Sequence, residues 1–146
     1  MTVADIFPTP DEALLPLFLH ILGAMGLVGA LLLAVTALAP AGGGPSLRLG
    51  YRSLLIAALP SWLVMRLAAQ WVADEEGVAE SEAAWIAIGY ITSELGLLLL
   101  LAATVCAGLS ARRGGRPGLT RAAFLLSAFM VAMYVVTIWA MTTKPE

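Results

Sequence analysis

Three ionisable residues lie inside long apolar stretches of the chain and are its first candidates for chemistry: His20, Arg66 and Glu94. A lone charge at the middle of a membrane costs at least about 2.5–3.5 kcal/mol, so such residues are usually paired or functional. Helix geometry puts Arg66 about 9 Å and Glu94 about 16 Å from the same membrane edge, a difference that the long arginine stem can cover. We therefore predict an Arg66–Glu94 ion pair. The alternative is that Arg66 reaches the interface while Glu94 is protonated against a carbonyl.

Two further polar residues share helix faces with this pair. Tyr90 lies four residues before Glu94, and Gln70 continues a stripe with Trp62 and Arg66. An ion pair in such a cluster can serve a function or only fix helix packing. The candidate ligand or ion-pair cluster consists of His20, Arg66, Gln70, Tyr90, Glu94 and Tyr134. We assign no catalytic residue.

A second kind of chemistry is suggested by sulfur. A stripe about 100° wide on the last helix holds Met130, Met133, Tyr134, Thr137 and Met141. Thioether and imidazole groups suit Cu(I), so His20 and Met133 are candidate metal ligands. One histidine allows a His–Met haem, or a bis-His haem across a dimer, but no bis-His haem within one chain. The alternative is that the methionines fill the core and that His20 is hydrogen-bonded inside it.

The composition sets the class of protein. The 146 residues are 60% apolar and 12% charged, against about 45–50% and 25% in soluble domains. This excess of apolar residues indicates a membrane protein of one domain, residues 1–146. A net charge of -2 leaves no basic surface for nucleic acid, and the single Cys106 can form neither an internal disulfide nor a CxxC metal site. Walker A, GxSxG and HExxH motifs are absent, so nothing supports hydrolysis or nucleotide use.

About 20 apolar residues are needed to cross a bilayer as a helix. Four stretches meet this requirement: residues 14–39, 54–72, 83–109 and 122–141. The first is not a signal peptide, because acidic residues and no basic ones precede it. Pro60 removes a backbone donor and predicts a kink in the second helix.

The charges of the connections predict an orientation. Six arginines, Arg48, Arg52, Arg112, Arg113, Arg116 and Arg121, fall in connections 40–53 and 110–121. Connection 73–82 is acidic, with Asp74, Glu75, Glu76, Glu80 and Glu82, and Lys144 is the only base near the tail. The positive-inside rule then places both termini and the acidic connection outside. Trp71, Trp85 and Trp139 fall at the outer interface and Tyr51 at the inner one, as an aromatic belt requires.

The segment Leu19-His20-Ile21-Leu22-Gly23-Ala24, continuing to Gly29-Ala30-Leu31-Leu32, resembles the first helix of the copper-resistance D-like membrane proteins and their small four-helix relatives. The ending Trp139-Ala140-Met141-Thr142-Thr143-Lys144-Pro145 is similar to the Met-x-x-Lys-Pro close of those relatives. The resemblance implies that His20 is a functional residue and that copper or haem is involved. This chain is shorter than the copper proteins and lacks their second ligand histidine.

We therefore expect an all-α, four-helix bacterial inner-membrane protein with extracytoplasmic termini. Its leading function is to bind a small ligand, metal or haem in the outer half of the bundle, alone, as a homo-oligomer or in a larger assembly. The alternatives are a scaffolding subunit and a redox or proton-transfer component using His20, Tyr90 and Glu94. Small residues after His20 leave room there for a planar group or another helix.

Overall fold

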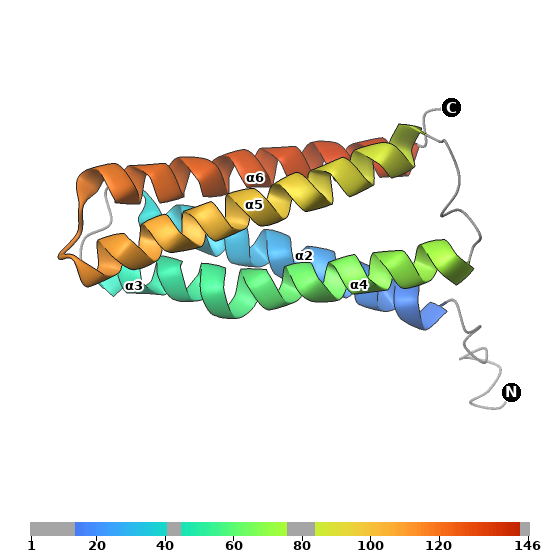
Figure 1. Ribbon diagram of the computed structural model, residues 1–146, viewed down its shortest axis with the longest axis horizontal. Coiled ribbons are helices and arrows are strands. Elements are labelled where there is room, and N and C mark those ends of the chain that lie inside the picture. The colour runs from blue at the N-terminus through green and yellow to red at the C-terminus, as the bar shows by residue number, and fades with distance from the viewer. Residues whose placement is uncertain (1–13, 41–44, 76–83, 144–146) are drawn as a thin grey trace, which may run out of the picture.

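The structure is a computed structural model that describes residues 14–40, 45–75 and 84–143. These residues form helices only, in the order α2 (Leu14–Leu38), α3 (Pro45–Arg52), the π-helical stretch η1 (Ser53–Ala58), α4 (Leu59–Glu75), α5 (Ala84–Arg112) and α6 (Pro117–Thr143). The predicted all-α class is confirmed. Figure 1 shows the helices running nearly alongside one another.

Four helical rods are each long and apolar enough to cross a membrane: Leu14–Leu38, Ser46–Glu75, Ile86–Arg112 and Pro117–Ala140. Many of their large apolar side chains are exposed, including Met25, Leu67, Ile91 and Trp139. Lipid is the solvent in which so much outward apolar surface is stable. By helix length and hydropathy, the chain is therefore a multi-pass membrane protein.

The second rod differs most from its predicted span of 54–72. It begins at Pro45, because α3, η1 and α4 follow one another without a break. Arg48 and Arg52 therefore lie on a helix and not in a connection. A hydropathy criterion misses α3 because this segment is polar and amphipathic, while Pro45 suits a first helical position. The fourth helix also begins at a proline, Pro117, five residues before its predicted start.

The predicted irregularity at Pro60 takes the form of a π-helical stretch. Residues 53–58 are π-helical, and the N–H of Leu59 donates to the carbonyl of Leu54, five residues back. Proline lacks an N–H and its ring collides with the carbonyl four residues earlier in a regular helix. The wider π turn just before Pro60 accommodates both defects within a continuous rod.

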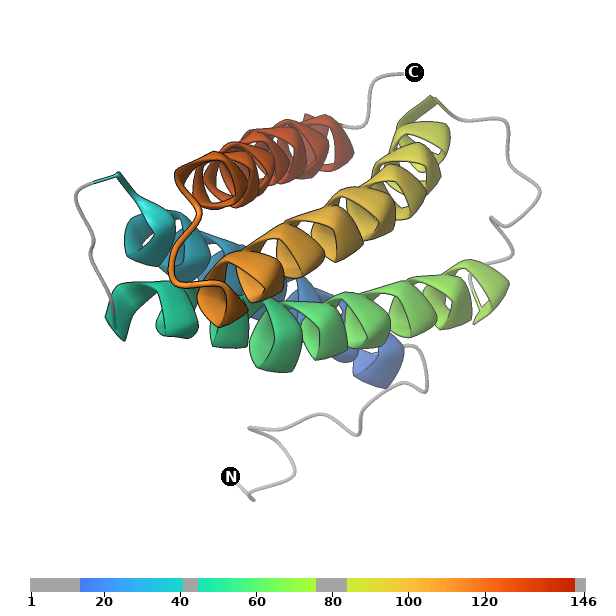
Figure 2. The same cartoon turned by 60° about the vertical axis from the view of Figure 1, so that its left-hand side comes forward.

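The helices pack in a ring, in which α2 contacts α4 and α6, and α5 packs on α6. The fully buried side chains between them include Leu27, Leu31, Leu54, Leu100 and Met130. The second rod meets α5 mainly through α3, whereas α4 and α5 make few backbone contacts. Figure 2 shows α4 and α5 diverging away from the α3 end. Side chains must therefore bridge the part of this boundary that is farther from α3. We call the boundary between α4 and α5 the α4–α5 seam.

Glycines allow α3 to pack closely at its end of the bundle. A Cβ on Gly50 would lie 2.6 Å from Cγ of Leu38, and one on Gly108 would lie 2.9 Å from Cε2 of Tyr51. Tyr51 thus lies against α5 at this end of the bundle. The α5–α6 turn follows, with Gly114 and Gly115 at φ of 73° and 82°, conformations that favour glycine.

Charged residues separate between the two ends of the described bundle. The six arginines named above lie on α3, at the end of α5, in the α5–α6 turn and at the start of α6. Asp74 and Glu75 lie at the opposite end of the second rod. The other residues of the predicted acidic connection, Glu76, Glu80 and Glu82, and the base Lys144, lie outside the described residues, as do the side chains of Trp85 and Met141.

Candidate functional site

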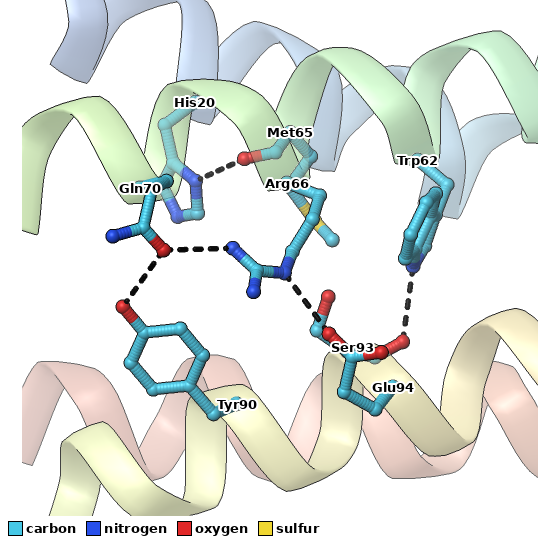
Figure 3. Close-up of polar contacts among 8 residues, drawn as sticks. All are labelled: His20, Trp62, Met65, Arg66, Gln70, Tyr90, Ser93 and Glu94. Atoms are coloured by element: carbon cyan, nitrogen blue, oxygen red, sulfur yellow. Dashed lines mark hydrogen bonds and ion pairs between the residues drawn. The ribbon is translucent and has the colours of Figure 1, made fainter.

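Three hydrogen bonds cross the α4–α5 seam (Figure 3). Nε1 of Trp62 donates to the carbonyl of Ser93 at 3.1 Å. One turn further along α4, Nε of Arg66 donates to Oε1 of Glu94 at 3.2 Å. One more turn along, the hydroxyl of Tyr90 donates to Oε1 of Gln70 over a long 3.4 Å. The four-residue spacing on α4 places its three side chains on one face, where antiparallel α5 meets them.

The predicted ion pair between Arg66 and Glu94 is present. Arg66 lies nine residues before the end of α4 at Glu75, and Glu94 lies ten after the start of α5 at Ala84. At 1.5 Å per residue both positions are about 14–15 Å from those helix ends, so the two residues lie at one depth. Helix α4 ends three residues later than predicted and α5 begins one residue later, which removes most of the difference in depth expected from the sequence. The side chain of Arg66 is 23% exposed and that of Glu94 is 61% exposed.

Arg66 has two further partners in this cluster. Its Nη1 donates to Oε1 of Gln70 at 3.3 Å, and its guanidinium carbon lies 5.0 Å from the centre of the Tyr90 ring. A cation over an aromatic face is attracted by the ring quadrupole. We call Arg66, Gln70, Tyr90 and Glu94 the polar cluster.

Sequence reasoning missed two members of the network around the cluster. Nε2 of Gln70 donates to Oδ1 of Asp74 at 3.1 Å, which connects the cluster to the acidic end of the rod. Asp74 was assigned to a connection, although it continues the four-residue spacing of Trp62, Arg66 and Gln70. That spacing is the signal that could have identified it. The Ser93 carbonyl carried no such signal, because every residue has one.

The polar cluster retains unused hydrogen-bonding capacity. Within the described residues, Nη2 of Arg66 and Oε2 of Glu94 make no hydrogen bond, whereas their neighbouring atoms do. The exposed side of the cluster therefore offers a charged donor next to a charged acceptor. Such a pair fits a partner that itself carries both an acceptor and a donor.

His20 lies at a different helix boundary. Its Nδ1 is 3.0 Å from the carbonyl oxygen of Met65, so Nδ1 carries the proton and donates this hydrogen bond. Gly23, one turn later, permits this contact, because a Cβ there would lie 2.6 Å from the backbone nitrogen of Met65. The space predicted beside His20 is thus occupied by helix α4. This geometry matches the alternative of a hydrogen-bonded core histidine.

Tyr134 and Met133 belong to the α5–α6 boundary. Tyr134 is buried against Gly96, and a Cβ on Gly96 would lie 3.6 Å from Cε of Met133. Near Gly96 both side chains therefore lie against α5, whereas the hydrogen bond of His20 is to the carbonyl of Met65 on α4. Among the described residues there is also no group of three or more His, Cys, Asp or Glu side chains placed to hold a metal ion.

A proton route through His20, Tyr90 and Glu94 has no continuous set of contacts in the described part of the chain. His20 bonds to Met65, Tyr90 to Gln70, and Glu94 to Arg66. Arginine keeps its proton at any ordinary pH, so it does not relay one.

Comparison with protein-family models, curated proteins and solved structures found no match to this chain. The resemblance to the copper-resistance D-like proteins stays a prediction from the segments quoted above.

Proposed function

We propose that the chain is a bacterial inner-membrane protein whose two termini lie outside the cytoplasm. The support is the charge separation: six arginines at the α3 end, against Asp74 and Glu75 at the other. Basic residues are retained on the cytoplasmic side of membranes. A C-terminal reporter active only in the cytoplasm should be silent, and one active only outside it should give signal. A strong cytoplasmic signal would reverse the orientation.

We propose further that the polar cluster binds a small polar ligand in the outer half of the bundle. One observation carries this proposal: a carboxylate that is 61% exposed lies well inside a membrane-length helix. Lipid cannot hydrogen-bond its free oxygen, so a partner or water must do so. The neighbouring Arg66 nitrogen adds a donor at the same place.

The charges of the cluster favour an organic ligand over a metal ion. A cation approaching Glu94 would also approach the permanently charged Arg66, and the two would repel. A ligand with a carboxylate or phosphate beside an amine or hydroxyl would satisfy both side chains. Copper or haem, which the resemblance implies, would instead use the free Nε2 of His20, with Met133 or a second copy of the chain supplying another ligand.

Native mass spectrometry of the purified protein tests the ligand proposal, together with an absorption spectrum and metal analysis. We expect a small molecule to copurify with the wild type and to be lost in Glu94→Gln. Glu75→Gln is the matched control, because Glu75 accepts a hydrogen bond from Trp71 near the helix end and not within the cluster. A Soret band or copper that His20→Ala removes would assign the ligand to His20. A wild type that carries no molecule or metal would contradict ligand binding.

The second candidate function is a scaffolding subunit. The same exposed Glu94 favours it, because a partner helix carrying a hydrogen-bond donor would also cover the seam. Ile91 is exposed and lies three residues before Glu94. If the chain is a scaffolding subunit, cross-linking from a cysteine placed at position 91 should trap a discrete partner or a second copy of the chain.

A further inference from the structure

An open cleft of about 810 Å³ lies at the opposite end of the molecule from the polar cluster, between α3 and the α5–α6 turn. Its lining includes Leu47, Arg48, Leu49, Arg52, Gly114 and Gly115. Figure 1 shows α3 beside the turn that joins α5 to α6. The volume is in the range of about 300–1,000 Å³ usual for small-molecule sites.

The two arginines of the cleft have no partner among the described residues. Arg48 and Arg52 are exposed, and neither makes an ion pair or a hydrogen bond with the described residues. Their four-residue spacing places them on one face of α3. The acidic residues that the structure describes are Asp74, Glu75 and Glu94, all on the far half of the bundle. Two positive charges thus line the cleft, and no acidic residue in the described part of the chain pairs with either.

The opposite wall of the cleft is a well-held turn. The N–H of Gly115 donates to the carbonyl of Ser110 at 2.9 Å, and the hydroxyl of Ser110 lies 2.7 Å from that of Thr120. Gly114 and Gly115 carry no side chain, so a ligand can approach this wall closely. A flexible loop would lose entropy on binding, which this turn largely avoids.

The cleft lies at the depth of lipid headgroups. The second rod spans 30 residues from Ser46 to Glu75, about 45 Å, which matches a bilayer including its headgroups. Arg48 and Arg52 lie three and seven residues from Pro45, about 5–10 Å from the end of that rod. Leu47 and Leu49 add apolar surface between and beside the charges.

We propose that this cleft binds the phosphate headgroup of an anionic phospholipid, held by Arg48 and Arg52. Guanidinium groups pair with phosphate oxygens, and basic pockets between membrane helices recognise such headgroups. The apolar lining fits an acyl chain and favours a lipid over free phosphate as the source of the anion.

The test measures binding of phosphatidylglycerol to the full-length protein in a neutral detergent. Native mass spectrometry detects the bound lipid, and the shift in melting temperature reports how strongly it binds. Arg48→Gln with Arg52→Gln should weaken binding about fivefold per arginine, or roughly 25-fold together. The matched control removes the same charge at the same end, by Arg116→Gln with Arg121→Gln, two exposed arginines that do not line the cleft. This control variant should change binding less than about threefold, because it removes only exposed charge that salt screens from the cleft.

Several results would overturn the proposal. Equal losses in the two double variants would mean a diffuse surface charge. Equal binding of phosphatidylcholine would mean that the anionic headgroup is not recognised. Displacement of the lipid by millimolar inorganic phosphate would mean a free-phosphate site. If the double variant does not fold, as judged by circular dichroism, the single variants Arg48→Gln and Arg52→Gln carry the same comparison.

Discussion

The ion pair between Arg66 and Glu94, with Nε and Oε1 3.2 Å apart, joins two helices that make few backbone contacts with each other. The second rod is held against α5 through α3, and beyond that point α4 depends on side chains to stay close. The deepest of these contacts is the hydrogen bond from Trp62 to the Ser93 carbonyl. The polar cluster is therefore at once a candidate binding site and part of what closes the bundle.

Breaking the ion pair should destabilise the protein through the charge left behind. Arg66→Leu and Glu94→Leu should each lower the free energy of unfolding by about 1–3 kcal/mol, less than the 3–5 kcal/mol of fully buried pairs, because Glu94 is exposed. The double variant should recover much of that loss. The free energy of unfolding is measured in mixed micelles for the wild type, the two single variants and the double variant. Strictly additive losses would show that the two residues do not interact.

Adding one methyl group at Gly23 should separate α2 from α4. The new Cβ would lie 2.6 Å from the backbone nitrogen of Met65, and backbone cannot move aside as a side chain can. We expect Gly23→Ala to cost about 1–3 kcal/mol or more. Gly29→Ala is the matched control on the same helix, since nothing lies within 4 Å of its Cβ position, and there alanine should gain up to about 1 kcal/mol. Similar melting temperatures for the two variants would contradict the packing described here.

Tyr134 and Gly96 should behave as a coupled pair. The Tyr134 hydroxyl is buried without a hydrogen-bond partner among the described residues and lies directly over Gly96. Tyr134→Phe removes an unsatisfied donor and should stabilise the protein by about 1 kcal/mol. Gly96→Ala should destabilise the protein on its own and should cost less in the Tyr134→Phe background, where the hydroxyl is gone but the ring carbon Cζ still lies 2.9 Å from the new Cβ. A destabilising Tyr134→Phe, seen by thermal unfolding, would mean that the hydroxyl does have a partner.

His20 should tolerate replacement by residues that keep a donor. Its contact with the Met65 carbonyl needs one N–H, which the amides of asparagine or glutamine also supply. His20→Ala should cost about 1 kcal/mol, the usual net value of a hydrogen bond, while His20→Gln or His20→Asn should cost less. Equal losses in all three variants, measured by thermal unfolding, would show that the imidazole itself is required, as a metal or haem ligand would be.

The sequence alone determined what depends on position along a helix. Hydropathy marked four spans, and the described arginines and acids do separate to the two ends of the bundle. The rise per residue and the reach of the arginine stem were together sufficient to predict the Arg66–Glu94 pair, although the predicted spans placed the two residues about 7 Å apart in depth. Hydropathy did not identify α3, because this amphipathic segment is not apolar enough to be counted as part of a membrane span.

The tertiary structure decided how each helix is rotated about its axis and which helix is its neighbour. His20 and Glu94 both contact the same turn of α4, yet His20 donates to the carbonyl of Met65 from α2, and Glu94 accepts from Arg66 across the seam. Tyr134, predicted in the same cluster, lies at the α5–α6 boundary instead. Rotation and neighbours follow from close contacts such as Gly23 on Met65, which depend on residues about 40 positions apart. Hydropathy reports the depth of a residue, but these contacts set its direction within the bundle.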